Sequence, residues 1–291
     1  MPLPAEDQAF RKQIFTNLKL EESLKPGDPR YEHVYDRPGC EDPAGRIRDQ
    51  IELSGGESTI FLSGFRGSGK TTELLRLKHE LEPDYVVIYA DAIDYLNPSQ
   101  PIEISSLLIV LAGAFDDAAR AEGIKLAGDS YWTRFSHWLT TTDVGLKEVG
   151  IKAGADLKLE LRSTPTFRQR VDNALKDRIG ELHRDVQAWF ELAYQEIRKQ
   201  RPDAQGVVFL FDSLEQIRGS LTEEAKVFRS VEFLFSNHLK FLSIPYFHVV
   251  YTVPPWLKFL LKGVEMTVIP CVRTWKNDDE RTPCREGIER H

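Results

Sequence analysis

Gly64-Phe-Arg-Gly-Ser-Gly-Lys-Thr71 is the stretch that decides the fold, because it joins an apolar run, Thr59–Ser63, to a helical pattern over Thr72–Leu81. Its glycines allow tight bends and a close approach to the backbone. Successive backbone N–H groups at the start of a helix then face an anion. A strand, a glycine-rich loop of the pattern GxxxxGK[ST] and a helix, in this order, predict a cradle for the phosphates of ATP.

Each part of the loop has a predicted task. Lys70 supplies a mobile positive charge for the β- and γ-phosphates, and the Thr71 hydroxyl is a hard oxygen ligand for Mg²⁺. The sequence carries no guanine-reading NKxD motif, and the expected ligands are ATP and Mg²⁺. The expected nucleotide-binding residues are Gly64, Phe65, Arg66, Gly67, Ser68, Gly69, Lys70, Thr71 and Thr72.

A second apolar run, Val207–Phe211, ends in Asp212, and Glu215 follows three places later. A carboxylate at the carboxyl edge of a parallel sheet can hold Mg²⁺ through the water shell of the ion. Glu215 is either a general base for an attacking water or a first-turn acid that helix electrostatics favour. We therefore expect Lys70, Asp212 and Glu215 to be catalytic, and Thr71 and Asp212 to be the metal ligands.

Other polar residues are weaker candidates. Thr252 ends a later strand and either faces the γ-phosphate or is a plain strand terminus. Asp91 and Asp94 follow the second strand at the same sheet edge, where acids are common. Four arginines could reach a phosphate or serve as an arginine finger, and none is singled out: Arg66, Arg168, Arg170 and Arg273.

The chain as a whole predicts an α/β domain with three layers and a five-stranded, mostly parallel sheet. Five short apolar runs with strand-forming residues predict the strands: Thr59–Ser63, Tyr85–Ala90, Val207–Phe211, Phe247–Thr252 and Met266–Pro270. Apolar spacing predicts a helix over Glu103–Glu122 and a long one from Thr166 to Gln200, about 50 Å at 1.5 Å per residue. Capping boxes are expected at Thr166 with Gln169 and at Ser220 with Glu223.

Residues 123–165 are predicted to be an insertion between the second and third strands. From Val149 to Leu161 the odd positions are apolar or alanine, a period of two that predicts a β-hairpin broken at Gly154. The insertion either covers a helix face or offers a surface to a partner. Around it we expect an N-terminal approach segment (1–50) with a short helix near Asp7–Leu20, a core (51–275) and a polar tail (276–291).

Composition narrows the class of protein. The net charge of −7 and the pI near 5.6 argue weakly against a broad nucleic-acid footprint, although a local basic patch stays possible. The three cysteines form no CxxC pair or zinc-type cluster, which fits a reducing cytosol. No signal peptide is visible, and the longest apolar run, Leu107–Phe115, is about half a membrane span. We therefore expect a cytoplasmic protein with no membrane contact.

Three stretches resemble bacterial ATPases of the AAA+/STAND type, relatives of origin-recognition and NACHT ATPases: Phe61–Leu74, Ala90–Asn97 and Pro101–Ser105. Asp212-Ser-Leu-Glu215 is similar to the NACHT variant of the Walker B element, and the resemblance spans roughly Asp36 to Val272. It implies a five-stranded parallel sheet of the ASCE type with one more strand between the two phosphate motifs. It also implies ATP-driven switching or assembly, self-association or an effector partner, and in several branches bacterial antiviral defence or signalling.

The chain departs from this group in two ways. Ser213 stands where many AAA+ proteins carry the catalytic glutamate, so hydrolysis is slow or depends on Glu215. The polar segment Asn277–Arg290 leaves no room for the lid, winged-helix or effector regions that usually follow, so we expect a truncation or a partner that supplies them.

The sequence therefore predicts a regulatory ATPase. The alternatives are a binding module with little turnover and a P-loop kinase. DNA remodelling is disfavoured by the acidic charge balance.

Overall fold

The computed structural model describes residues 12, 23–31, 33, 35, 41–141, 155–219, 222–261 and 263–270. Five strands form one sheet in the order β2-β3-β4-β1-β5, and every neighbouring pair is parallel. The strands are β1 (Ser58–Ser63), β2 (Val86–Asp91), β3 (Val207–Asp212), β4 (Phe247–Val253) and β5 (Met266–Val268). All five predicted runs are thus strands, and the α/β class is confirmed.

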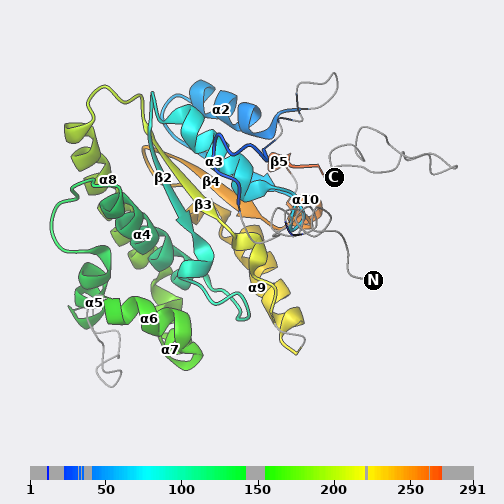
Figure 1. The fold of residues 1–291 in the computed structure, drawn as a ribbon. Coiled ribbons are helices and arrows are strands. Elements are labelled where there is room, and N and C mark those ends of the chain that lie inside the picture. Colours follow the sequence, from blue (N-terminus) through cyan, green and yellow to red (C-terminus); the bar gives the residue numbers. More distant parts are fainter. Residues whose placement is uncertain are drawn as a thin grey trace, which may run out of the picture.

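The inner strands are mainly apolar because helices cover both faces of the sheet. All residues of β3 and β4 are buried. Helices α2 (Pro43–Leu53) and α3 (Lys70–Leu81) lie over one face, and α4 (Ile104–Ala121), α8 (Ile179–Gln200) and α9 (Glu224–Asn237) lie over the other (Figure 1). Alternate residues of each strand pack into two separate hydrophobic cores, one on each face of the sheet. Leu62, Leu210 and Val250 pack on the α3 side, whereas Phe61, Phe209 and Tyr251 pack on the α4 side.

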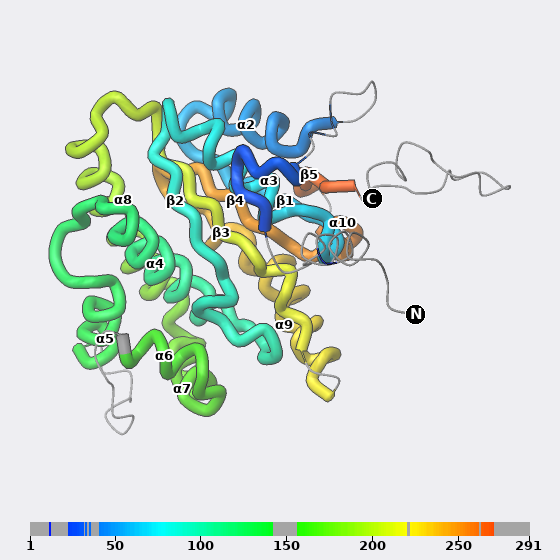
Figure 2. Tube along the Cα trace, in the orientation of Figure 1, coloured from blue at the N-terminus to red at the C-terminus, as the bar shows by residue number. Residues whose placement is uncertain are grey.

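Strand order brings the two predicted motifs to one edge. The loop after β1 and the end of β3 lie at the carboxyl ends of parallel strands, with β4 between them (Figure 2). The expected extra strand between the two motifs is therefore β4. Its register with β1 runs from Ser58–His248 to Ser63–Val253, so the carboxyl ends of the two strands lie level.

The predicted hairpin is wrong where the structure describes it. Residues Ala155–Ser163 form helix α6, in which Leu157 and Leu161 are buried and Leu159 is 62% exposed. The spacing of four between the buried leucines is helical, so the alternation of apolar residues was misleading. Residues 142–154, with Gly154, lie outside the described part of the chain.

The predicted single helix over Thr166–Gln200 is also wrong, because it is two helices. Helix α7 (Pro165–Leu175) ends in a 3₁₀ turn, η3 (Lys176–Arg178), before α8 begins at Ile179. The N-cap of α7 is Thr164, with Pro165 at the first helical position, so the predicted capping box at Thr166 is absent. Helix α9 likewise begins at Glu224 with Glu223 as N-cap, and the predicted box partner Ser220 lies outside the described residues.

The remaining helices and 3₁₀ turns belong to the helical layers on the two faces of the sheet. Helix α2 was not predicted, and it crosses the boundary drawn at residue 50 with Ala44, Ile47 and Ile51 in the core. The predicted helix over Asp7–Leu20 lies outside the described residues except at Lys12. The short elements are α5 (Tyr131–Thr141), α10 (Leu257–Leu260), and the 3₁₀ turns η1 (Ala92–Asp94), η4 (Leu214–Gln216) and η5 (Leu239–Phe241). Within the described ranges, no helix is both long and apolar enough to cross a bilayer.

Candidate functional site

The end of β3 is joined directly to the start of α3. The Thr71 hydroxyl donates to Asp212 Oδ2 at 2.6 Å, the Tyr89 hydroxyl donates to the same oxygen at 3.0 Å, and the Ser213 N–H donates to Oδ1 at 2.7 Å. Asp212 is fully buried. Both predicted metal ligands, Thr71 and Asp212, therefore lie side by side.

Lys70 is buried at the first position of α3. Its ammonium group donates to Gly64 O at 3.0 Å and to Phe65 O at 2.9 Å, and it forms an ion pair with Glu215 Oε1 at 3.1 Å. The three predicted catalytic residues thus form one cluster. Lys70 pairs with Glu215, and the adjacent Thr71 is bound to Asp212.

Glycine is required at particular places in the loop Gly64–Lys70. Gly67 and Gly69 have φ angles of +79° and +90°, a region that L side chains rarely adopt. A Cβ on Gly64 would lie 2.6 Å from Ser68 Oγ and 3.3 Å from the backbone oxygen of Ile269. Phe65 and Arg66 are exposed at the tip of the loop.

Several buried oxygens near this edge have no hydrogen-bond partner among the described residues. They include the second carboxylate oxygen of Glu215, Thr252 Oγ1 at the end of β4, and Ser68 Oγ in the loop. Buried polar atoms are rarely left unpaired without reason. These atoms fit an edge that receives a polar ligand.

Asp91 and Tyr89 bring a second strand into the site. Asp91 lies opposite Asp212 in the β2–β3 register. Burial raises the pKa of Asp91 to about 6, against the hydrogen bond from the Ile93 N–H, which lowers it. Burial, together with the Asp212 charge, also raises the pKa of Tyr89. Tyr89 was missed from the sequence, although its place two residues before Asp91 puts it on the same face of β2.

The arginine candidates differ in their surroundings. Arg168 is buried and donates to the backbone oxygen of Pro101 at 3.1 Å, and burial lowers the pKa of its guanidinium. Arg170 donates to Thr166 O of its own helix at 3.3 Å. Arg273 lies outside the described residues, and Arg66 remains the candidate on the loop itself.

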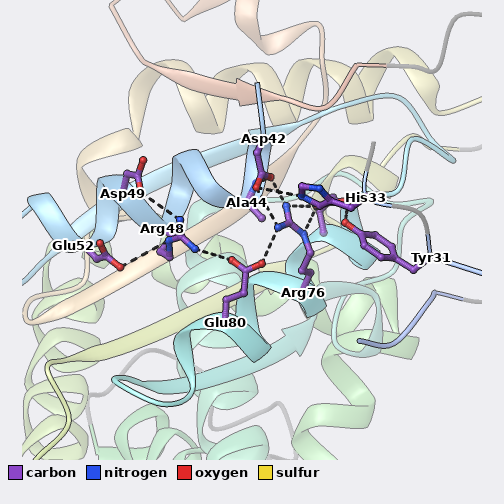
Figure 3. Close-up of polar contacts among 10 residues, drawn as sticks. Tyr31, His33, Asp42, Ala44, Arg48, Asp49, Glu52, Arg76 and Glu80 are labelled. Carbon is purple, nitrogen blue, oxygen red and sulfur yellow. Dashed lines mark hydrogen bonds and ion pairs between the residues drawn. The ribbon is translucent and has the colours of Figure 1, made fainter. Parts of the chain in front are cut away.

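The N-terminal segment that precedes α2 contacts the start of α3, which was not predicted. The Leu24 N–H donates to Thr72 Oγ1 at 3.3 Å, and the Tyr31 hydroxyl donates to Glu73 Oε1 at 3.2 Å. Arg76 then binds Asp42 as well as Glu73 at 2.8 Å and Glu80 at 2.7 Å (Figure 3). This segment therefore belongs to the surroundings of the loop.

The residues fit a magnesium nucleotide by the chemistry of their donors. The Asp212 carboxylate and the Thr71 hydroxyl lie in contact, and Mg²⁺ takes one carboxylate and one hydroxyl when phosphates and water complete its shell. The described residues contain no cluster of three or more His, Cys, Asp and Glu that could hold a metal ion without a substrate. No model of a known protein family matches the chain, and a search of curated proteins finds no match.

Proposed function

We propose that this protein binds ATP with Mg²⁺ at the loop Gly64–Thr72 and hydrolyses it as a regulatory ATPase. The observation that carries the proposal is the paired contact at one sheet edge, Thr71 to Asp212 at 2.6 Å and Lys70 to Glu215 at 3.1 Å. A glycine loop, a lysine, a hydroxyl and two acids, one at the end of β3 and one in the turn after it, are the parts that phosphoryl transfer to water needs.

In this proposal, each group of the site has a separate role in binding or hydrolysis. The first N–H groups of α3 have no partner inside the helix, so they are free to hold phosphate oxygens. Lys70 exchanges Glu215 for the β- and γ-phosphates, and Thr71 and Asp212 hold Mg²⁺, which when bound neutralises phosphate charge. Once released from Lys70, Glu215 accepts the proton of the attacking water. The unpartnered Thr252 hydroxyl is suited to orient that water or the γ-phosphate.

The resemblance to AAA+/STAND ATPases supports a switch rather than a metabolic role. In this proposal, the bound nucleotide sets a conformation or an assembly state in the cytoplasm, through self-association or an effector partner, and antiviral defence is the process we favour. Size measured by light scattering with and without ATP tests this part, because a switch of assembly predicts a shift in mass.

Phosphate release tests the chemistry. Lys70→Ala should lose nucleotide binding, and Asp212→Asn should lose the Mg²⁺ dependence of binding. Glu215→Gln should bind ATP normally and lower kcat by roughly 10²- to 10⁴-fold, the scale of removing a general base. Lys78→Ala is the matched control on α3, because Lys78 binds Glu82 and Glu122 instead. Normal turnover in Lys70→Ala would refute the proposal.

A nucleotide-binding module with little turnover is the second candidate. The observation that favours it is Ser213, which occupies the position directly after Asp212 and carries no carboxylate. Tight ATP binding with no phosphate release in the wild type would select this candidate. Transfer of label to an acceptor would instead select a kinase.

A further inference from the structure

The Asp212 carboxylate accepts hydrogen bonds from three parts of the chain. Its Oδ2 accepts from the Thr71 hydroxyl of α3 at 2.6 Å and from the Tyr89 hydroxyl of β2 at 3.0 Å, and its Oδ1 accepts from the Ser213 N–H at 2.7 Å. The torsion that turns an aspartate carboxylate about its Cβ–Cγ bond has broad minima, so its hydrogen-bond partners decide its orientation. Of the three donors, Tyr89 is the one to which the proposed function gives no task.

Tyr89 reaches Asp212 from a strand whose position is fixed by the sheet. It lies opposite Leu210 in β2, which pairs with β3 over six consecutive positions, and its half-buried ring packs against the core on the α3 side. A phenol is protonated at neutral pH and an ionised carboxylate only accepts, so Tyr89 is the donor. Its hydroxyl therefore holds Asp212 independently of the loop Gly64–Lys70.

These contacts limit how Asp212 can meet a metal ion. An ionised carboxylate has roughly four acceptor sites, two on each oxygen. Thr71 and Tyr89 take both sites on Oδ2, and Ser213 takes one on Oδ1, so the described contacts leave one site, on Oδ1. A single site suits a water of the Mg²⁺ shell, because Mg²⁺ keeps several of its waters.

We propose that Tyr89 is a positioning residue for the metal: together with Thr71 it occupies Oδ2, fixes the plane of the Asp212 carboxylate and leaves Oδ1 to the water shell of Mg²⁺. The role rests on the proposed binding of ATP with Mg²⁺. In it, Tyr89 touches neither the ion nor the nucleotide and acts through Asp212.

Binding of a fluorescent ATP analogue to the full chain, measured in EDTA and at increasing free Mg²⁺, tests the role. Tyr89→Phe keeps the ring and removes the hydroxyl. Its affinity in EDTA should equal that of the wild type, whereas the free Mg²⁺ concentration for half-maximal binding should rise roughly 10- to 100-fold, the usual effect of losing a hydrogen-bond partner of a metal ligand. Saturating Mg²⁺ should restore kcat.

Tyr251→Phe is the matched control, because it also removes a tyrosine hydroxyl from the sheet. The Tyr251 hydroxyl donates to Leu242 O at 2.8 Å within the core on the α4 side. This variant should keep the Mg²⁺ requirement of the wild type. An equal loss of affinity with and without Mg²⁺ in Tyr89→Phe would make its hydroxyl a structural contact between β2 and β3 and overturn the inference. An unchanged Mg²⁺ requirement in Tyr89→Phe would overturn it as well.

A crystal structure of unliganded Tyr89→Phe tests the positioning without nucleotide. We expect the Asp212 carboxylate to turn about its Cβ–Cγ bond, so that Oδ2 no longer faces Thr71. An unchanged orientation would overturn the inference even if the wild type binds and hydrolyses ATP. Absence of ATP binding in the wild type would instead refute the proposed function, and the crystal structure would still decide whether Tyr89 orients Asp212.

Discussion

At the scale of single residues, the loop Gly64–Lys70 combines conformations that only glycine adopts freely with side chains that must be placed accurately. Gly69 is the N-cap of α3 at φ +90°, directly before Lys70, and a Cβ there would meet nothing within 4 Å. The requirement for glycine at this position is therefore a matter of backbone conformation alone.

We expect Gly69→Ala to lower the free energy of unfolding by about 1–2 kcal/mol, the cost of a left-handed conformation with a side chain. It should also weaken ATP binding, because relief of the strain displaces Lys70. Gly263→Ala is the matched control, since Gly263 has φ +80°, has open space around it and follows α10. It should show the same loss in urea unfolding and normal nucleotide binding. Equal effects of both variants on binding would contradict this account.

His248 gives the protein a pH-dependent stability. It is 2% exposed on β4, and its Nδ1 lies 3.0 Å from Ser58 Oγ and 3.4 Å from Ser54 Oγ. Burial lowers its pKa, although the charge of Glu57 acts in the opposite direction. The unfolded chain then binds a proton more tightly than the folded protein, so the stability is present above the unfolded pKa of about 6.5 and is lost as the pH falls below it.

Urea unfolding measured from pH 7.5 to pH 5 should show this loss, and His248→Gln should flatten part of the slope. The rest of the slope should remain in this variant, because burial also lowers the pKa values of His183 and His238. His137→Gln on the exposed face of α5 serves as control. A slope in His248→Gln equal to that of the wild type would contradict the assignment.

At the scale of elements, sequence patterns predicted the strands and helices that are specified by residues close together in the chain. The five strands follow from apolar runs bounded by glycine or polar residues, and α4 follows from a helical apolar stripe. The pattern failed at α6, because Leu157, Leu159 and Leu161 fit a strand as well as a helix until burial separates them. It failed at η3, because apolar spacing continues through Leu175, Ile179 and Leu182 with no proline to mark the break.

The candidate site was predictable where its residues lie next to each other in sequence. The loop and the carboxylate at the end of β3 each carry a local signal. The contacts of Tyr89 with Asp212 and of Leu24 with Thr72, and the pairing of Asp91 with Asp212, join strands or segments far apart in the chain. No local pattern encodes them, because they depend on strand order.

Two glycines lie inside helices, and replacing each with alanine should change the stability of the protein in opposite directions. A Cβ on Gly113 of α4 would lie 2.1 Å from the Trp132 ring, whereas one on Gly180 of α8 would meet nothing within 4 Å. We expect Gly113→Ala to destabilise the protein by about 1–3 kcal/mol through overpacking between α4 and α5. Gly180→Ala should stabilise it by about 0.4–1 kcal/mol. Thermal unfolding measures both, and a stabilised Gly113→Ala would show that the α4–α5 contact can yield.

At the scale of the whole molecule, one sheet supports two cores. A substitution that destabilises the core on one face of the sheet should therefore also destabilise the core on the other face. Alternate residues of β1, β3 and β4 belong to opposite cores, and every tryptophan in the described residues packs on the α4 side: Trp132, Trp138, Trp189 and Trp256. With Trp275, which lies outside the described residues, replaced by phenylalanine, tryptophan fluorescence therefore observes the face opposite α3.

Leu77 of α3 is fully buried on the α3 side. We expect Leu77→Ala to lower the free energy of unfolding by about 2–5 kcal/mol, the cost of a core cavity. Because the layers share their strands, tryptophan fluorescence and circular dichroism should report this loss at the same urea midpoint. Leu53→Ala is the matched control in the same helical layer, since Leu53 is 85% exposed and should lose almost nothing. If the fluorescence midpoint of Leu77→Ala stayed at that of the wild type while circular dichroism shifted, the two layers would unfold independently.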